Sequence, residues 1–147
     1  MAKQKITPSQ QNVVAFRAYR NAALTATTGT PFVVFDTVQY NYGSGYNSST
    51  GYFTAPVSGV YVFNAAIATD PSSTARTFYT PSGTAAGIYR TRSGDGKYQA
   101  SSLWRQQGVW QVYMNAGETF GLGVYSETNN SIQGFETWFG GYLVMGV

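Results

Sequence analysis

Residues 60–67 read VYVFNAAI, and the alternation in this stretch decides the fold class. Successive side chains of a β-strand point to opposite faces, so an apolar residue at every second position marks a strand with one buried side. One side of this stretch carries Tyr61, Phe63, Ala65 and Ile67. The other side carries Val60, Val62, Asn64 and Ala66. We therefore expect a strand whose first set of side chains lies in the core.

Two further alternating stretches lie on either side of a turn at residues 115–117. The first places large apolar groups at Trp110, Val112 and Met114, and the second at Phe120, Leu122 and Val124. Asn and Gly in the turn are typical of tight connections between strands. No window of 11 or more residues shows the 3.6-residue apolar stripe of a helix. The pattern predicts an all-β chain.

The last expected strand, residues 135–144, is apolar on both sides. One side carries Phe135, Thr137, Phe139, Gly141 and Leu143, and the other Glu136, Trp138, Gly140, Tyr142 and Val144. A strand of this kind leaves an apolar patch in water unless a second layer or another subunit covers it. We expect such a cover.

Composition limits the possible functions. The 147 residues are 43% hydrophobic and only 10% charged, against about 25% in an average domain. A net charge of +3 predicts no nucleic-acid partner, and the absence of a long apolar run predicts no membrane insertion. The chain has no Cys and no His, which removes disulfides, thiolate chemistry and imidazole catalysis. We expect no enzymatic activity.

The chain is organised as an arm and one domain. Residues 1–12 are polar, contain Pro8 and lack the apolar run of a secretion signal, so we expect a flexible arm or docking segment. The domain covers residues 13–147. Within it, Asp95-Gly96 predicts a hairpin turn, and residues 68–87 read as a loop with one irregular strand.

Acidic residues offer little for catalysis or metal binding. A glycosidase needs two carboxyl groups in one cleft, and the six acids lie mostly at expected turns or strand ends. Calcium is the ion that such oxygen ligands suit best, with Asp70, Asp95 and Glu127 as candidates. No D-x-D-x-D-G loop is present, so we expect neither a metal nor a cofactor. Two interpretations of Arg90 and Arg92 are open: a patch that binds a polyanion, or strand charges that are simply exposed to water.

Residues 35–63, FDTVQYNYGSGYNSSTGYFTAPVSGVYVF, resemble the signature of the globular head domain of complement C1q and its relatives. The family pattern is an aromatic residue and Asp, then Asn, Gly, Tyr, Thr-Gly, Phe, Pro and Gly-x-Tyr-x-Phe. The matching positions are Phe35, Asp36, Asn41, Gly43, Tyr46, Thr50, Gly51, Phe53, Pro56, Gly59, Tyr61 and Phe63. The flanking stretches AFRA (15–18), MNAGE (114–118) and TWFGGYL (137–143) resemble the opening strand, a turn and the closing strand of the family.

This resemblance implies a jelly roll of two antiparallel sheets, shared with the tumour necrosis factor ligands and assembled as a homotrimer. The signature residues that it assigns to the core are Phe35, Phe53, Gly59, Tyr61, Phe63, Phe139 and Gly141. Phe16, Trp110, Val112 and Leu143 complete the expected core. Candidates for the trimer interface are Tyr113, Trp138 and Tyr142, because Tyr and Trp bury much area with few rotamers. A platform on which carbohydrate stacks is the alternative role for these residues.

Two functions fit this resemblance. Without cysteine, leader or collagen-like stalk, the chain fits a phage or virus surface protein best, as a decoration or fibre head. Residues 1–12 would dock it to the particle, and its loops would contact a glycan or protein on the host. The alternative is a recognition module, secreted or displayed on a cell or bacterial surface, that binds a protein or glycan ligand.

Overall fold

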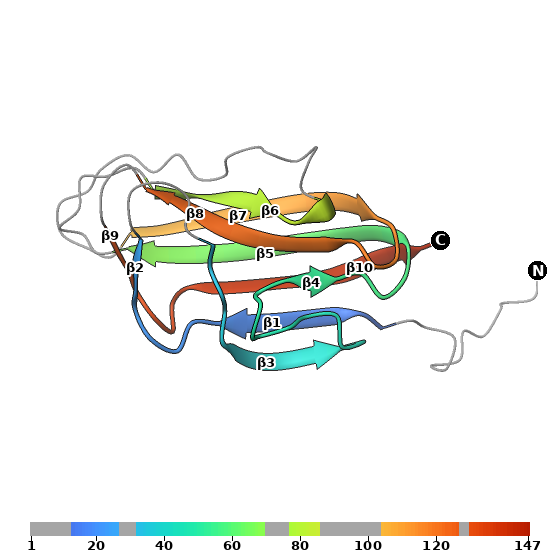
Figure 1. Ribbon diagram of the computed structural model, residues 1–147, viewed down its shortest axis with the longest axis horizontal. Coiled ribbons are helices and arrows are strands. Elements are labelled where there is room, and N and C mark those ends of the chain that lie inside the picture. Colours follow the sequence, from blue (N-terminus) through green and yellow to red (C-terminus); the bar gives the residue numbers. More distant parts are fainter. Residues whose placement is uncertain (1–12, 27–31, 70–76, 86–103, 127–129) are drawn as a thin grey trace, which may run out of the picture.

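The computed structural model describes residues 13–26, 32–69, 77–85, 104–126 and 130–147. Its strands form two packed layers, and no helix in these residues has the length and hydropathy needed to cross a bilayer (Figure 1). The strands are β1 (Ala15–Tyr19), β2 (Leu24–Ala26), β3 (Thr37–Tyr42), β4 (Phe53–Thr54), β5 (Gly59–Thr69), β6 (Thr77–Ser82), β7 (Trp104–Met114), β8 (Thr119–Ser126), β9 (Asn130–Ile132) and β10 (Trp138–Gly146).

The larger layer is a seven-stranded sheet. Its main path runs β2-β9-β5-β10-β1-β3, and β7 also pairs with β5. All pairings within the sheet are antiparallel. The sheet brings together β1 and β10, from opposite ends of the described chain, with Phe16 opposite Gly141.

The smaller layer is a three-stranded antiparallel sheet with the order β4-β8-β6. The turn after β7 therefore does not close a hairpin. It carries the chain from the large sheet, where β7 pairs with β5, to the small sheet, where β8 pairs with β4 and β6. The alternation predicted both strands correctly but could not show that they belong to different layers.

The core is a layer of aromatic rings between the two sheets. Phe63 of β5 stacks on Phe120 of β8 with 4.3 Å between ring centroids, and Phe16 meets Phe139 edge-on at 5.0 Å. The structure buries eight of the nine expected core side chains and half-buries Leu143. Offset and edge-on ring contacts of this kind add to the free energy gained from burial alone.

Glycine is required where a ring crosses a strand. A Cβ at Gly141 would lie 2.5 Å from Cδ1 of Phe63, which is closer than real contacts allow. A Cβ at Gly59 would overlap the backbone carbonyl oxygen of Met145. Both signature glycines therefore allow close packing between β5 and β10.

The expected start of the last strand was wrong. β10 begins at Trp138, three residues later than the alternation predicted, because residues 134–136 form a bend. Phe135 has a positive φ of 55° there and is 69% exposed, so it does not lie in the core. At its other end β10 has an irregular register between Leu143 and Met145, which interrupts the simple alternation.

Several predictions concern segments outside the described residues. They are the arm at residues 1–12, the Asp95-Gly96 turn, the arginines Arg90 and Arg92, and the calcium candidates Asp70, Asp95 and Glu127. Of the stretch 68–87, the structure describes the end of β5 and residues 77–85, which contain β6.

Candidate functional site: the outer face of the large sheet

The outer face is the surface of the large sheet that points away from the small sheet. On β1, β3, β5, β7 and β10 it is formed by the residues that alternate with the core positions. The strand registers align these residues in rows across the sheet. One row runs Tyr40, Arg17, Gly140, Asn64 and Val109, and the next runs Tyr42, Ala15, Tyr142, Val62 and Gln111.

The three residues expected at a subunit contact all lie on this face. Tyr113 and Tyr142 are each 47% exposed, and Trp138 is half-buried. They come from strands β7 and β10, which both pair with β5, so one sheet carries all three. The structure brings them onto one surface, and their role as contact residues stays a prediction.

Apolar groups that the sequence reading did not single out extend this surface. Tyr40 and Tyr42 of β3 have their rings stacked, with centroids 5.8 Å apart. Val109 of β7 is 70% exposed. A run of aromatic and aliphatic groups across five strands is much larger than the scattered apolar residues of an ordinary surface.

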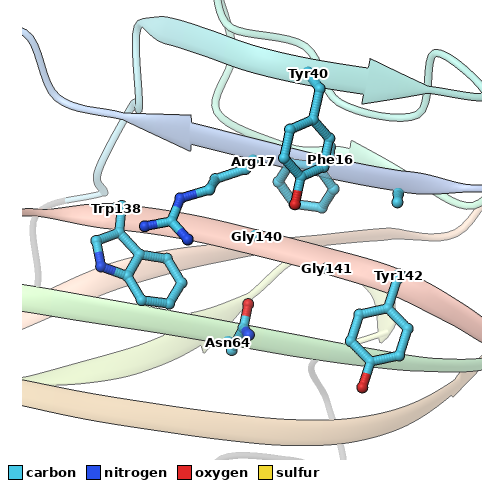
Figure 2. Close-up of a pocket in the computed structure, with 9 residues that line it drawn as sticks. Phe16, Arg17, Tyr40, Asn64, Trp138, Gly140, Gly141 and Tyr142 are labelled. Atoms are coloured by element: carbon cyan, nitrogen blue, oxygen red, sulfur yellow. The ribbon is translucent and has the colours of Figure 1, made fainter.

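A pocket of about 300 Å³ is set into the middle of the outer face. Gly140 leaves its floor without a side chain, while Tyr40, Trp138 and Tyr142 stand around it (Figure 2). A Cβ at Gly140 would come within 3.0 Å of the backbone oxygen of Phe16. The pocket exists because glycine is the residue that fits there.

Arg17 supplies the charge of the pocket. Its guanidinium carbon lies 4.1 Å from the centroid of the Trp138 ring, a cation–π contact. Arg17 is the one charged side chain of the outer face among those that the structure describes. The polar partners at the pocket are the amide of Asn64 and the hydroxyl of Tyr40, both drawn facing inward (Figure 2).

Sequence reasoning missed Arg17, Tyr40 and Asn64 as members of one site. They come from β1, β3 and β5. They become neighbours through the pairing of β1 with β3 and β10 and the pairing of β10 with β5. The pairing of β1 with β3 also contains a register shift after Arg17. The one available signal was the Gly-Gly pair at 140–141, which marks a close backbone approach in a strand.

Away from the outer face, charged groups have structural roles. Asp36 lies 3.6 Å from Arg20 and accepts hydrogen bonds from the backbone of Asn21 and the hydroxyl of Thr37. Glu118 accepts one from the backbone of Asn115 within the turn before β8. Among the described residues no three acids gather into a group that could hold a metal ion.

Tyr46 holds the connection between β3 and β4 to the core. Its hydroxyl donates to the carbonyl oxygen of Phe35 at 2.9 Å and accepts from the Phe35 backbone at 3.2 Å. Its ring stacks on Phe16 with centroids 4.7 Å apart. Burial raises the pKa of Tyr46 well above its usual range. This tyrosine is a structural member of the signature and does not contribute to the outer face.

Comparison with known proteins gives one family and one fold. The family model described as the C1q domain matches residues 15–144. The globular domain of zebrafish complement 1qA protein is similar, with a TM-score of 0.69 and 19% identity over 91% of this chain and 99% of that chain. The Eiger TNF of S. frugiperda has a TM-score of 0.66 and 15% identity over 93% and 96%. Murine APRIL at pH 8.0 has a TM-score of 0.63 and 10% identity over 90% and 99%.

Proposed function

Since this chain belongs to the C1q domain family, we propose that it works as a homotrimer whose outer faces close against neighbouring copies while its loops bind another surface. C1q-like domains are non-enzymatic binding modules, and members of the C1q and TNF families form homotrimers and bind protein ligands. The expected jelly roll of two antiparallel sheets agrees with the fold of the structure and its neighbours.

The observation that carries the proposal is the aromatic outer face. Tyr42 is 61% exposed, Val109 70%, and Tyr113 and Tyr142 are each 47% exposed on one sheet. Burying apolar surface yields roughly 25 cal/mol for each Å², so closing such a face stabilises the assembly. The inner side of this sheet is already covered by the small sheet. In a closed trimer the neighbouring copies would also remove its apolar outer side from water.

The substitution Tyr142→Glu tests this role. It replaces an aromatic ring of the outer face by a carboxylate, and taking a charge out of water on association costs several kcal/mol. We expect light scattering to report monomers or aggregates in place of trimers. Thr54→Glu is the matched control, because Thr54 lies exposed on β4 of the other sheet. A soluble trimer from Tyr142→Glu would remove this residue from the interface.

We further propose that the trimer is located on a virion surface, as a decoration or fibre head. β1 begins and β10 ends at the same end of the sandwich (Figure 1), so one end can attach while the opposite end meets a host glycan or protein. The lack of cysteine supports this setting, since a protein that folds in a reducing cytoplasm cannot rely on disulfides.

Removal of residues 1–12 tests the attachment. We expect the shortened protein to keep its fold and its trimer and to stop co-sedimenting with particles purified from the same source. Circular dichroism and light scattering provide the control for folding and assembly. Unchanged co-sedimentation would contradict the docking role of the arm. If the protein that retains residues 1–12 does not co-sediment but binds a protein or glycan ligand, the alternative of a recognition module is favoured.

A further inference from the structure

We propose that the aromatic pair of Tyr19 and Phe135 is a sugar-binding site, on which a neutral sugar unit of a surface glycan stacks. The pair lies where β1 ends and β10 begins, because Tyr19 is paired with Trp138 at the start of β10. This is the end of the sandwich opposite to the one proposed for attachment (Figure 1). The assignment rests on the proposed function and adds the residues and the ligand class of its host-binding end.

Phe135 contributes little to the stability of the folded chain. It is 69% exposed, which makes it the most exposed aromatic side chain among those that the structure describes. Its φ of 55° lies in the left-handed region, where a bulky side chain is strained and glycine is not. Strained residues of this kind gather at sites that contact ligands. An exposed ring on a strained backbone therefore points to a role in binding another molecule.

The backbone on both sides of Phe135 is held by the connection that follows β1. The N–H of Phe135 donates to the carbonyl oxygen of Arg20 at 2.6 Å, and the N–H of Arg20 donates to that of Thr137 at 3.0 Å. Gly134 packs so closely on this connection that a Cβ there would lie 2.9 Å from the carbonyl carbon of Ala22. The bend is therefore preorganised, and binding at the ring requires little further ordering of the chain.

The two rings offer an apolar surface with hydrogen-bonding groups beside it. The ring centroids of Tyr19 and Phe135 are 6.0 Å apart, and the ring planes are inclined by 33°. The C–H face of a sugar ring is apolar and packs on the electron-rich face of an aromatic ring. Next to the pair, the backbone N–H of Asn21 donates to the carboxylate of Asp36 at 2.9 Å, and both residues are exposed. Amide and carboxylate groups of this kind can bind sugar hydroxyls.

The described charges near this pair favour a neutral sugar over an anionic one. Arg20 is mostly buried, donates to the carbonyl oxygen of Val34 at 2.8 Å and lies 3.6 Å from Asp36. Arg17 lies over the Trp138 ring on the outer face, which the proposed trimer would close. Neither cation is therefore available to an acidic sugar that stacks on Phe135.

The small size of the aromatic pair favours a glycan over a protein. A stable protein partner would need a contact of about 800 Å² on each side. A sugar unit needs little more than one ring and a few hydrogen bonds, and it binds weakly at a single site. Three copies in one trimer would bind a surface with repeated sugar units far more tightly than one copy does.

The substitution Phe135→Gly tests the site, because it removes the ring and suits a φ of 55°. The probe is an array of immobilised neutral oligosaccharides of glucose, galactose, mannose and N-acetylglucosamine, together with sialylated forms. We expect the unchanged trimer to bind neutral oligosaccharides, and Phe135→Gly to bind them at least about tenfold more weakly. The urea midpoint should not fall. Phe135→Tyr is the matched control, because it keeps a ring at this position and should keep the binding.

Four results would overturn the inference while the trimer stands. Binding to none of the oligosaccharides would leave a protein surface as the partner of Phe135, and binding only to sialylated forms would contradict a neutral ligand. Undiminished binding by Phe135→Gly would place the sugar elsewhere. A lower urea midpoint or a weaker trimer from Phe135→Gly would assign the ring to folding or to subunit contact.

A variant that does not fold and a protein that does not assemble give distinguishable results. If Phe135→Gly does not fold, Phe135→Asn is measured in its place with the same expected loss of binding, because asparagine also tolerates the left-handed region. If the unchanged protein sediments as single copies, the proposed function itself fails, whatever the array shows.

Discussion

The two sheets differ in the side chains that they carry on their outward surfaces. On the small sheet the outward positions are mostly small or hydroxyl-bearing, as at Thr54, Thr80 and Thr119. On the large sheet they include large apolar groups, at Tyr40, Tyr42, Val109, Tyr113, Trp138 and Tyr142. Both sheets bury their inner faces against each other, so the difference lies only in how each outward surface meets its surroundings.

The small sheet is covered by its own chain. The rings of Phe32 and Tyr52 stack with centroids 4.5 Å apart and lie over Gly121 of β8, where a Cβ would meet both rings at 2.9 Å. The hydroxyl of Tyr52 lies 3.3 Å from that of Ser82 in β6. No described residue gives the outer face of the large sheet a comparable cover. One cover is therefore intramolecular and belongs to folding, whereas the proposed trimer would supply the other.

Removing one ring from each sheet should show which ring stabilises the folded chain and which stabilises the trimer. It is also the change with the largest expected effect on folding. Tyr52→Ala removes a half-buried ring and its stack on Phe32, which should lower the free energy of unfolding by about 2 kcal/mol. Tyr42→Ala, on the exposed outer face, should leave unfolding almost unchanged and weaken the trimer. Urea denaturation in the Tyr142→Glu background measures the folding term alone. An equal loss of unfolding free energy in the two variants would contradict the assignment of one surface to folding and the other to assembly.

The tyrosines between the sheets should make stability depend on pH, and this smaller effect appears only in alkaline solution. Burial raises the pKa values of Tyr46, Tyr61 and Tyr79 above 10, the value that they regain on unfolding. The folded state therefore holds their protons more tightly, so stability is fully present below pH 10 and falls as the pH rises above it. Urea midpoints between pH 8 and 11 should show this decline. The Tyr142→Glu variant should show the same decline, because the groups responsible lie within one copy.

Much of the fold could be predicted from local pattern. The alternation in residues 60–67 and 109–124 assigned the buried side chains of β5, β7 and β8, because a strand with one face in the core repeats every two residues. The start of β10 was placed too early, because Phe135 adopts a left-handed backbone conformation that apolar alternation does not encode. Which layer β8 joins also required the three-dimensional structure, since the turn at 115–117 has the same composition in either case.

The candidate site could be predicted only in part, for a related reason. Trp138 and Tyr142 share a face because they lie four residues apart on one strand, and counting along the chain is enough. The pocket needs Arg17 beside Gly140 and Asn64, and these contacts depend on the pairing of strands far apart in the sequence. Distant pairing is set by the whole core, so no single stretch of sequence contains it.

The most direct test of the account is the mass of the unchanged protein at high dilution, measured by sedimentation equilibrium. We expect a particle of three 15.9 kDa copies that persists on dilution, with Trp138 and Tyr142 protected from a water-soluble labelling reagent. A stable 15.9 kDa species in which both side chains are labelled at the rate of free amino acids would contradict the account.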